Sequence, residues 1–144
     1  MKTILFFFSV ILLSVISLEK GKILPAKYKN ETKVIKFMYS EEYLVDYGEK
    51  MFWDNIQEHA IMFQDRFEIK NLVKTLPQST SKLFKNHNYC FIIPNKKDND
   101  TVYADFSLKA WIIKENGKSK YYYDEKGNLA KDLRANYSFF KECW

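Results

Sequence analysis

The side chains of this chain that are best suited to chemistry are its two histidines and two cysteines. Glu58 and His59 are adjacent, and a carboxylate near an imidazole can carry out acid–base catalysis. Successive residues of a helix diverge by about 100°, so in the helix expected over this region the two side chains would not face each other. We therefore expect His59 to be a half-buried core residue and keep Glu58 and His59 as candidates for lining a pocket.

His87 lies three residues before Cys90, and a cysteine activated by histidine is a common nucleophile. Either the two side chains point to opposite faces of a strand or His87 lies outside the strand, and both cases favour a structural role for the cysteine. Cys143 is the second of the two cysteines, and cysteines of exported proteins are usually paired. We predict a Cys90–Cys143 disulfide, which loop-closure entropy makes worth about 4 kcal/mol. Two free thiols in the unreduced protein would contradict this pairing.

Several motifs of catalysis are missing from the sequence. It contains no Gly-x-Ser-x-Gly nucleophile elbow and no His-Glu-x-x-His metal motif. The four glycines, at positions 21, 48, 117 and 127, do not have the spacing of a phosphate-binding loop. A zinc site with four Cys or His ligands would need every cysteine and histidine of the chain. We therefore expect no catalytic residue, no metal and no cofactor.

The first residues have the pattern of an export signal. Lys2 precedes an apolar run over residues 4–16, which is shorter than the roughly 20 residues of a membrane-spanning helix. Small residues favour cleavage after Ser17, and the sequence becomes polar at Glu19. We predict a signal peptide over residues 1–17 and one exported domain over residues 18–144, periplasmic or secreted, with no membrane span after cleavage. An uncleaved N-terminal anchor is the alternative.

Charge is segregated along the chain. Residues 40–69 contain eight acids and two bases, whereas residues 70–97 contain six lysines and no acid. Lysine outnumbers arginine by 21 to 2, while nucleic-acid readers favour arginine, so we expect no nucleic-acid partner. We interpret the lysines first as a solvated face and second as a docking surface for an acidic partner. With three tyrosines that either fill the core or are exposed, the candidate interaction surface is Lys70, Lys74, Lys82, Lys85, Lys96, Lys97, Tyr121, Tyr122 and Tyr123.

The pattern of apolar residues predicts a strand over Lys33–Tyr39, followed by one long amphipathic helix. Ser40 has the character of an N-cap, and apolar residues then recur every three or four positions as far as Phe67. Asn116-Gly117 is typical of a two-residue hairpin turn. The other expected elements are strands over Tyr89–Pro94, Val102–Ile113, Tyr121–Tyr123 and Asn128–Leu133, a turn over Asp124–Gly127, and a segment Tyr137–Trp144 that fits helix or strand.

This order of elements predicts an α+β fold, in which one long helix packs on a curled antiparallel meander sheet of four to five strands. The order resembles the cystatin-like layout, in which a sheet grips one helix. The Gln-x-Val-x-Gly loop motif of cystatins is absent, so the resemblance implies a fold and carries no activity or site residue.

Two functions are compatible with these observations. The first is a small exported non-catalytic domain that binds another protein, as an inhibitor or as a periplasmic immunity protein that neutralises a toxin. The alternative is a small secreted enzyme or ligand-binding domain with a pocket between helix and sheet, where Glu58, His59 and Tyr122 would be tested first. A structural role at the cell surface is a third reading, and the oligomeric state is left open.

Overall fold

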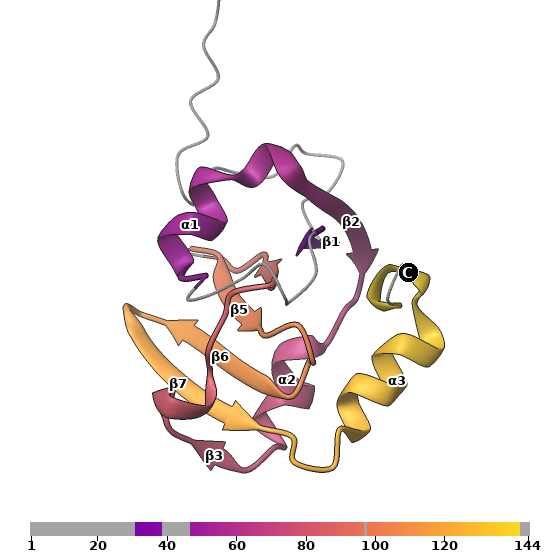
Figure 1. Ribbon diagram of the computed structural model, residues 1–144. Helices are drawn as coiled ribbons and strands as arrows, with labels where there is room; N and C mark the ends of the chain where they lie inside the picture. Colours follow the sequence, from indigo (N-terminus) through magenta and orange to yellow (C-terminus); the bar gives the residue numbers. More distant parts are fainter. Residues whose placement is uncertain (1–30, 39–46, 97, 142–144) are drawn as a thin grey trace, which may run out of the picture.

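The computed structural model describes residues 31–38, 47–96 and 98–141. These residues form a seven-stranded antiparallel sheet with the order β2-β1-β4-β5-β6-β7-β3 (Figure 1). The strands are β1 (Glu31–Phe37), β2 (His59–Asp65), β3 (Gln78–Ser79), β4 (Tyr89–Ile93), β5 (Asp100–Ala104), β6 (Ala110–Glu115) and β7 (Lys118–Tyr123). The helices are α1 (Glu49–Asp54), α2 (Ile69–Lys74) and α3 (Asn128–Asn136), with 3-10 helices η3 (Ile56–Glu58), η4 (Ser81–Leu83) and η5 (Ser138–Phe140).

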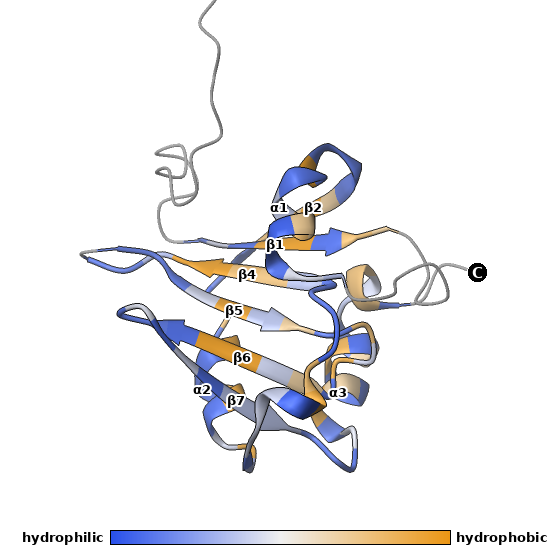
Figure 2. Ribbon diagram, turned by 60° about the vertical axis from the view of Figure 1, so that its left-hand side comes forward, coloured by the Kyte–Doolittle hydropathy of each residue, from blue (hydrophilic) through white to orange (hydrophobic). Residues whose placement is uncertain are grey.

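Side chains alternate between the two faces of the sheet, and each face carries a hydrophobic cluster. On the first face Val34, Phe91 and Val102 lie in register across β1, β4 and β5 beneath α2, α3 and η5. On the second face Ile35 and Cys90 lie in register, and α1 packs against this cluster. Figure 2 shows the sheet with α1 at its upper end and with α2 and α3 behind it. The first face is therefore closed, whereas the second is covered only in part.

The long helix predicted after Ser40 is wrong, and so is the cystatin-like arrangement of one long helix on a meander sheet of four to five strands, because the sheet has seven strands and its order is not a meander. Residues 39–46 lie outside the described part, and beyond them α1 ends at Asp54. Asn55 is the C-cap of α1: its backbone N–H makes the last helical bond, to the carbonyl of Met51. Its side-chain amide donates to the same oxygen, a local side-chain bond that favours the end of a helix over its interior. After η3 the chain becomes β2, which pairs with β1 along its whole length.

The apolar spacing was misleading because β2 carries apolar residues on both faces. Ile61 pairs with Ile35 and belongs to the second face, whereas Met62 pairs with Val34 and packs against the first. A short apolar run of this kind fits a helix and a doubly covered strand equally well.

The single strand predicted over Val102–Ile113 is also wrong, because the chain turns back within it. Asp105 makes the turn between β5 and β6: its Oδ1 accepts the backbone N–H groups of Lys109 and Ala110, and its Oδ2 accepts the hydroxyl of Ser107. Leu108 takes a φ of 59° at this turn. Two turn-forming side chains therefore separate two strands that sequence patterning had joined.

Other local predictions are confirmed. β1 and β4 match the predicted strands, and Asn116 and Gly117, with φ values of 50° and 72°, form the tight turn between β6 and β7. Gly127 has a φ of 67° at the following turn. Beyond it the predicted strand is wrong. Residues 128–136 form α3, whose Leu129 N–H is capped by the Asp124 carboxylate at 2.8 Å.

Candidate functional site

A groove of about 530 Å³ opens on the second face of the sheet, between α1 and the strand ends. Its floor is a row of side chains in register, Ile92 on β4, Thr101 on β5 and Lys114 on β6. α1 contributes one wall, and residues 95, 96, 98 and 99 form the rim together with the β6–β7 turn. The other described residues that line the groove are Glu49, Trp53, Asn95, Lys96, Asp98, Asn99, Asp100, Tyr103, Asn116 and Gly117.

A hydrogen-bonded network crosses the inner end of the groove, with Tyr103 at its centre. The Tyr103 hydroxyl accepts the indole N–H of Trp53 at 3.0 Å and donates to Oε1 of Glu49 at 2.9 Å. The Lys114 ammonium donates to both oxygens of Glu49, at 2.9 and 2.8 Å. Every member of this network thus already has a partner, and the network ties α1 to β5 and β6.

The network also sets the protonation of its members. Burial alone would raise the pKa of Glu49, but the hydrogen bonds from Lys114 and Tyr103 and the Lys114 charge outweigh it and lower that pKa. The pKa of Tyr103 is raised, mainly by burial and then by the neighbouring Cys90. At neutral pH Glu49 is therefore ionised and paired with Lys114, and this pair beside the Tyr103 phenol links α1 to the sheet.

We expect Glu49→Gln to destabilise the protein most at neutral pH. The folded-state pKa of Glu49 lies below its ordinary value of 4.5, so its contribution to stability is present above that value and is lost as the pH falls through the lower folded-state pKa. Urea unfolding of the wild type and Glu49→Gln at pH 7 and at about pH 3 measures this, with exposed Glu125→Gln as the control. An equal difference between the two proteins at both pH values would contradict it.

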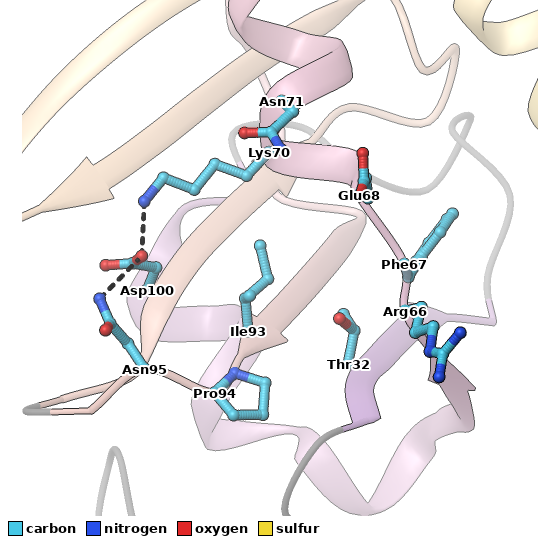
Figure 3. Close-up of a pocket in the computed structure, with 10 residues that line it drawn as sticks. All are labelled: Thr32, Arg66, Phe67, Glu68, Lys70, Asn71, Ile93, Pro94, Asn95 and Asp100. Carbon is cyan, nitrogen blue, oxygen red and sulfur yellow. Dashed lines mark hydrogen bonds and ion pairs between the residues drawn. The ribbon is translucent and has the colours of Figure 1, made fainter.

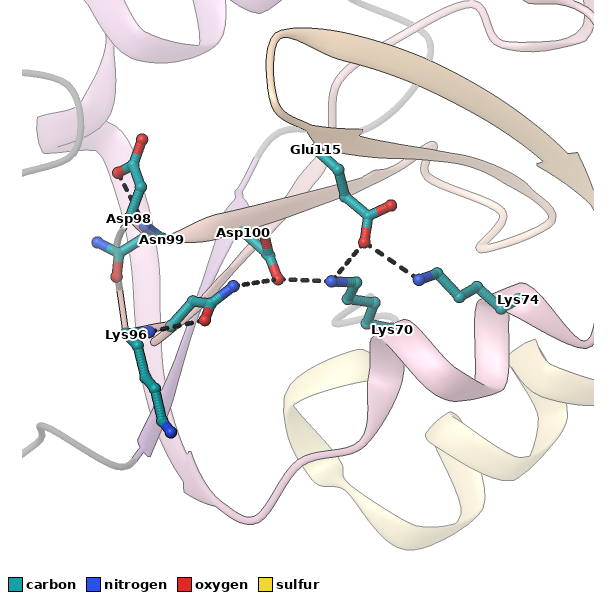
Figure 4. Close-up of polar contacts among 8 residues, drawn as sticks. Lys70, Lys74, Lys96, Asp98, Asn99, Asp100 and Glu115 are labelled. Carbon is teal, nitrogen blue, oxygen red and sulfur yellow. Dashed lines mark hydrogen bonds and ion pairs between the residues drawn. The ribbon is translucent and has the colours of Figure 1, made fainter.

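A second pocket, of about 460 Å³, lies on the first face beside the start of α2 (Figure 3). Lys70 extends across it to Asp100, which also accepts the amide of Asn95. Figure 4 shows that Lys70 and Lys74 both reach Glu115. These pairs lower the pKa of Glu115. The polar groups of this pocket are thus held together by ion pairs that join α2 to the sheet.

The predicted lysine surface is consequently only partly a free cationic face. Lys70 and Lys74 are neutralised by acids from β5 and β6, that is, from outside the lysine-rich segment. Lys82 and Lys85 are exposed on and after η4. Of the remaining two, Lys96 is exposed and lines the groove, and Lys97 lies outside the described residues.

The three tyrosines do not form an exposed patch. Tyr122 is buried in the first-face cluster, opposite Trp111, whereas Tyr121 and Tyr123 are half-buried. Tyr121 packs against the second-face cluster, in register with Ile112. The tyrosines therefore belong largely to the core of the domain.

Glu58 and His59 are not brought together over a pocket. Glu58 is exposed at the end of η3. The His59 ring lies at the start of β2 between Phe37 and Phe52, with ring centroids 5.0 and 4.4 Å away. Burial lowers the pKa of His59, and the backbone of Asn55 offsets this only in part. His59 is therefore a half-buried core residue, although it stands on a strand and not on a helix.

Cys90 and His87 also serve the packing of the second face. Cys90 is fully buried in register with Ile35 and Tyr103, and burial raises the pKa of its thiol. His87 lies between the rings of Phe84 and Tyr103, at 4.9 and 4.8 Å. Cys143 lies outside the described residues, so the predicted disulfide stays a prediction.

We expect the Cys90 thiol to be unreactive while the protein is folded. A fully buried cysteine with a raised pKa forms little thiolate, and reagents cannot reach it. In Cys143→Ser, where Cys90 has no cysteine to pair with, an aromatic disulfide reagent should modify it only after denaturation. Rapid modification of Cys90 in folded Cys143→Ser would contradict this burial.

The residues that define the groove were missed at the sequence level. Glu49 and Trp53 stand four positions apart on α1, which places both on one side of the helix. That spacing could have indicated a shared helix face, but both residues lay within the predicted long helix and were not singled out. Tyr103 and Lys114 gave no such signal, because only the pairing of β5 with β6 places them near each other.

Comparison with models of protein families, with curated proteins and with solved structures gives no match for this chain. Among the residues that the structure describes, no helix is long and apolar enough to cross a membrane. Within the same residues, no group of three or more His, Cys, Asp or Glu side chains could hold a metal ion.

Proposed function

We propose that this protein is a small, exported, non-catalytic domain that binds another protein, and that the groove between α1 and the sheet takes a protruding segment of that partner. The observation that carries the proposal is the lining of the groove. It combines apolar side chains, Trp53 and Ile92, with a polar rim of Asn95, Lys96, Asp98, Asn99 and Asn116. Such a lining suits a polypeptide, which presents both apolar side chains and backbone hydrogen-bonding groups.

The charges of the groove favour a segment without strong net charge. Lys114 neutralises Glu49, and Lys70 neutralises Asp100 from the other side of the sheet. Lys96 and Asp98 on the rim have opposite signs and are exposed. Among the described residues of the groove, each cation therefore has a carboxylate within the groove or at its rim, which favours a partner segment without strong negative charge.

The satisfied network supports binding in preference to catalysis. Tyr103, Glu49 and Lys114 hold one another, so they fix the shape of the groove before a partner arrives. A site that is already in shape loses less conformational entropy on association. Together with the predicted export signal, this fits an inhibitor or a periplasmic immunity protein.

The alternative function, uptake of a small ligand, concerns the same place in the molecule. The groove does lie between a helix and the sheet, as that alternative requires, but it is lined by Glu49 and Tyr103 and not by Glu58, His59 or Tyr122. A small molecule recovered from the groove by native mass spectrometry would favour the alternative over the binding of a protein.

The experiment compares groove variants with matched controls in the capture of a partner from the native host. Asp98→Arg places a bulky cation on the rim, and Thr101→Trp fills the floor. Asp132→Arg makes the same charge change at an exposed position of α3, and Thr80→Trp adds the same ring at an exposed position before η4.

We expect the wild type and both control variants to retain one protein partner in stoichiometric amount, and both groove variants to lose it. Circular dichroism confirms that each variant is folded. A partner held equally well by Asp98→Arg and Thr101→Trp would contradict the assignment of the groove, and recovery of no partner at low salt would contradict the protein-binding function itself.

A further inference from the structure

The ammonium of Lys70 joins two carboxylates that belong to different strands. It lies 2.5 Å from Oδ2 of Asp100 on β5 and 2.5 Å from Oε1 of Glu115 on β6. The side chains of Lys70, Asp100 and Glu115 are 21%, 17% and 24% exposed, respectively, and Figure 4 shows Lys70 reaching from α2 to both acids. This bridge is therefore a charge-assisted contact in a partly buried place and not a loose pair on the surface.

The two acids stand where the two halves of the groove's rim leave the sheet. Asp100 begins β5, directly after the rim residues of the β4–β5 loop, and Glu115 ends β6, directly before the Asn116–Gly117 turn. Lys70 reaches both from α2 on the first face, whereas the groove opens on the second, and Lys70 is not among the described residues that line it. Lys70 is thus placed to act on the rim from the opposite side of the sheet.

The register of the sheet shows why these two acids need a cation between them. β5 and β6 pair as far as Thr101 and Lys114, and Asp100 and Glu115 come one position beyond that pair. Like charges opposite each other on neighbouring strands repel and weaken the pairing. Within the described part of the chain, Lys70 is the cation that contacts both carboxylates and so offsets this repulsion.

We propose that Lys70 is a positioning residue of the groove: by bridging Asp100 and Glu115, its ammonium holds the two halves of the rim at the separation that a partner meets. The use of the groove rests on the proposed function, while the bridge itself is a property of the free protein. Without Lys70, the two carboxylates would repel each other where the rim begins, and the rim would open. A partner that fits the closed rim would then bind more weakly, although Lys70 does not touch it.

The attachment of α2 does not depend on this bridge. Ile69 and Val73 are fully buried in the first-face cluster. Lys74 makes its own contact with Glu115, at 3.1 Å. We therefore expect loss of the Lys70 charge to alter the rim and to leave α2 on the sheet.

Hydrogen–deuterium exchange of the free protein measures the order of the rim without any partner. Lys70→Met keeps the length of the side chain but removes its charge, and exchange over residues 98–101 and 114–117 should become about tenfold faster. Exchange over residues 71–73 of α2 and 89–92 of β4 should not change. Lys70→Arg, whose guanidinium can also contact two carboxylates, should keep the wild-type exchange. Lys74→Met is the matched control on the same helix: it loses one contact with Glu115, leaves the bridge intact and should have little effect.

A double variant separates the repulsion of the acids from the loss of a side chain. Lys70→Met combined with Glu115→Gln removes one of the two like charges together with the cation, so the rim should regain most of its protection. Should Lys70→Met fail to fold, the same comparison is made with Lys70→Gln. Unchanged exchange at the rim, equally faster exchange over the whole domain, or no recovery in the double variant would each overturn the proposal.

The captured partner supplies the second part of the test. Its affinity should fall about tenfold in Lys70→Met and return to the wild-type value in Lys70→Arg. Full affinity in a Lys70→Met protein whose rim exchanges faster would overturn the role of the bridge in binding and leave the groove as the binding site. If no partner is recovered at all, the proposed function fails, and the exchange measurement alone decides whether Lys70 orders the rim.

Discussion

Replacing Trp111 by alanine is expected to lower the free energy of unfolding by about 3–5 kcal/mol, the usual range for a large aromatic side chain of a core. Trp111 is fully buried on β6 in the first-face cluster, with its ring 5.7 Å from that of Phe91. Its indole N–H donates to the carbonyl of Leu108 at 2.9 Å, so alanine would leave a cavity and also an unpaired carbonyl at the β5–β6 turn. Urea unfolding followed by circular dichroism measures the change.

One further variant separates the cavity from the lost hydrogen bond, and a second serves as a surface control. Trp111→Phe keeps an aromatic ring in the core but removes the indole N–H, so its effect should be clearly smaller than that of alanine. Leu83→Ala, at a residue that is 47% exposed, should change stability by less than about 0.5 kcal/mol. A loss of less than about 1 kcal/mol in Trp111→Ala would contradict the central position of Trp111 in the core.

The second large loss of stability is expected when Lys36, a buried residue of β1, is replaced. Its ammonium donates to the carbonyls of Phe139 and Lys141, at 3.1 and 3.0 Å, and lies 5.9 Å from the centre of the Tyr89 ring. Lys36→Met keeps the length of the side chain but leaves both carbonyls without this donor. We expect a loss of about 1–3 kcal/mol, the range for buried polar groups that lose their partner.

Removal of this contact should also loosen the segment after α3. Trypsin should cleave after Lys141 faster in Lys36→Met than in the wild type, because Lys36 holds the carbonyl at that bond. Exposed Lys118→Met is the matched control and should alter neither stability nor cleavage. Unchanged stability together with unchanged cleavage would show that Lys36 does not hold the segment.

The parts of the fold that could be predicted from the sequence are those with a local cause. Asn116-Gly117 accepts positive φ at both turn positions, so the hairpin of β6 and β7 follows from two residues. β1 and β4 are runs of apolar and β-branched residues between polar segments, and nothing distant is needed to identify them.

The parts that failed depend on distant contacts. Residues 59–65 become a strand because β1, far earlier in the chain, offers a complete partner for them. For α3 a local signal existed, since Leu129 and Leu133 are one helical turn apart and Asp124 precedes them as a cap. Because a strand was expected over Tyr121–Tyr123, the residues after the next turn, 128–133, were predicted to form another strand.

The candidate site shows the same limit. The sequence predicted a pocket between helix and sheet as an alternative. The groove does use a short part of the predicted helix, α1, but its lining contains none of the residues named for the pocket. Lys70 and Lys74 were predicted to be a cationic surface because their acidic partners, Asp100 and Glu115, lie some 30 to 40 positions further along the chain. Strand pairing places Asp100 and Glu115 on neighbouring strands, and the packing of α2 on the sheet brings Lys70 and Lys74 to them.

Hydrogen–deuterium exchange of the protein with and without its captured partner tests the proposed binding site most directly. Binding in the groove predicts that exchange slows in residues 49–53, 92–96 and 98–101, and that residues 69–76 and 128–136 on the opposite face exchange as before. Protection confined to that opposite face, with no change over residues 92–96 and 98–101, would contradict the groove as the binding site.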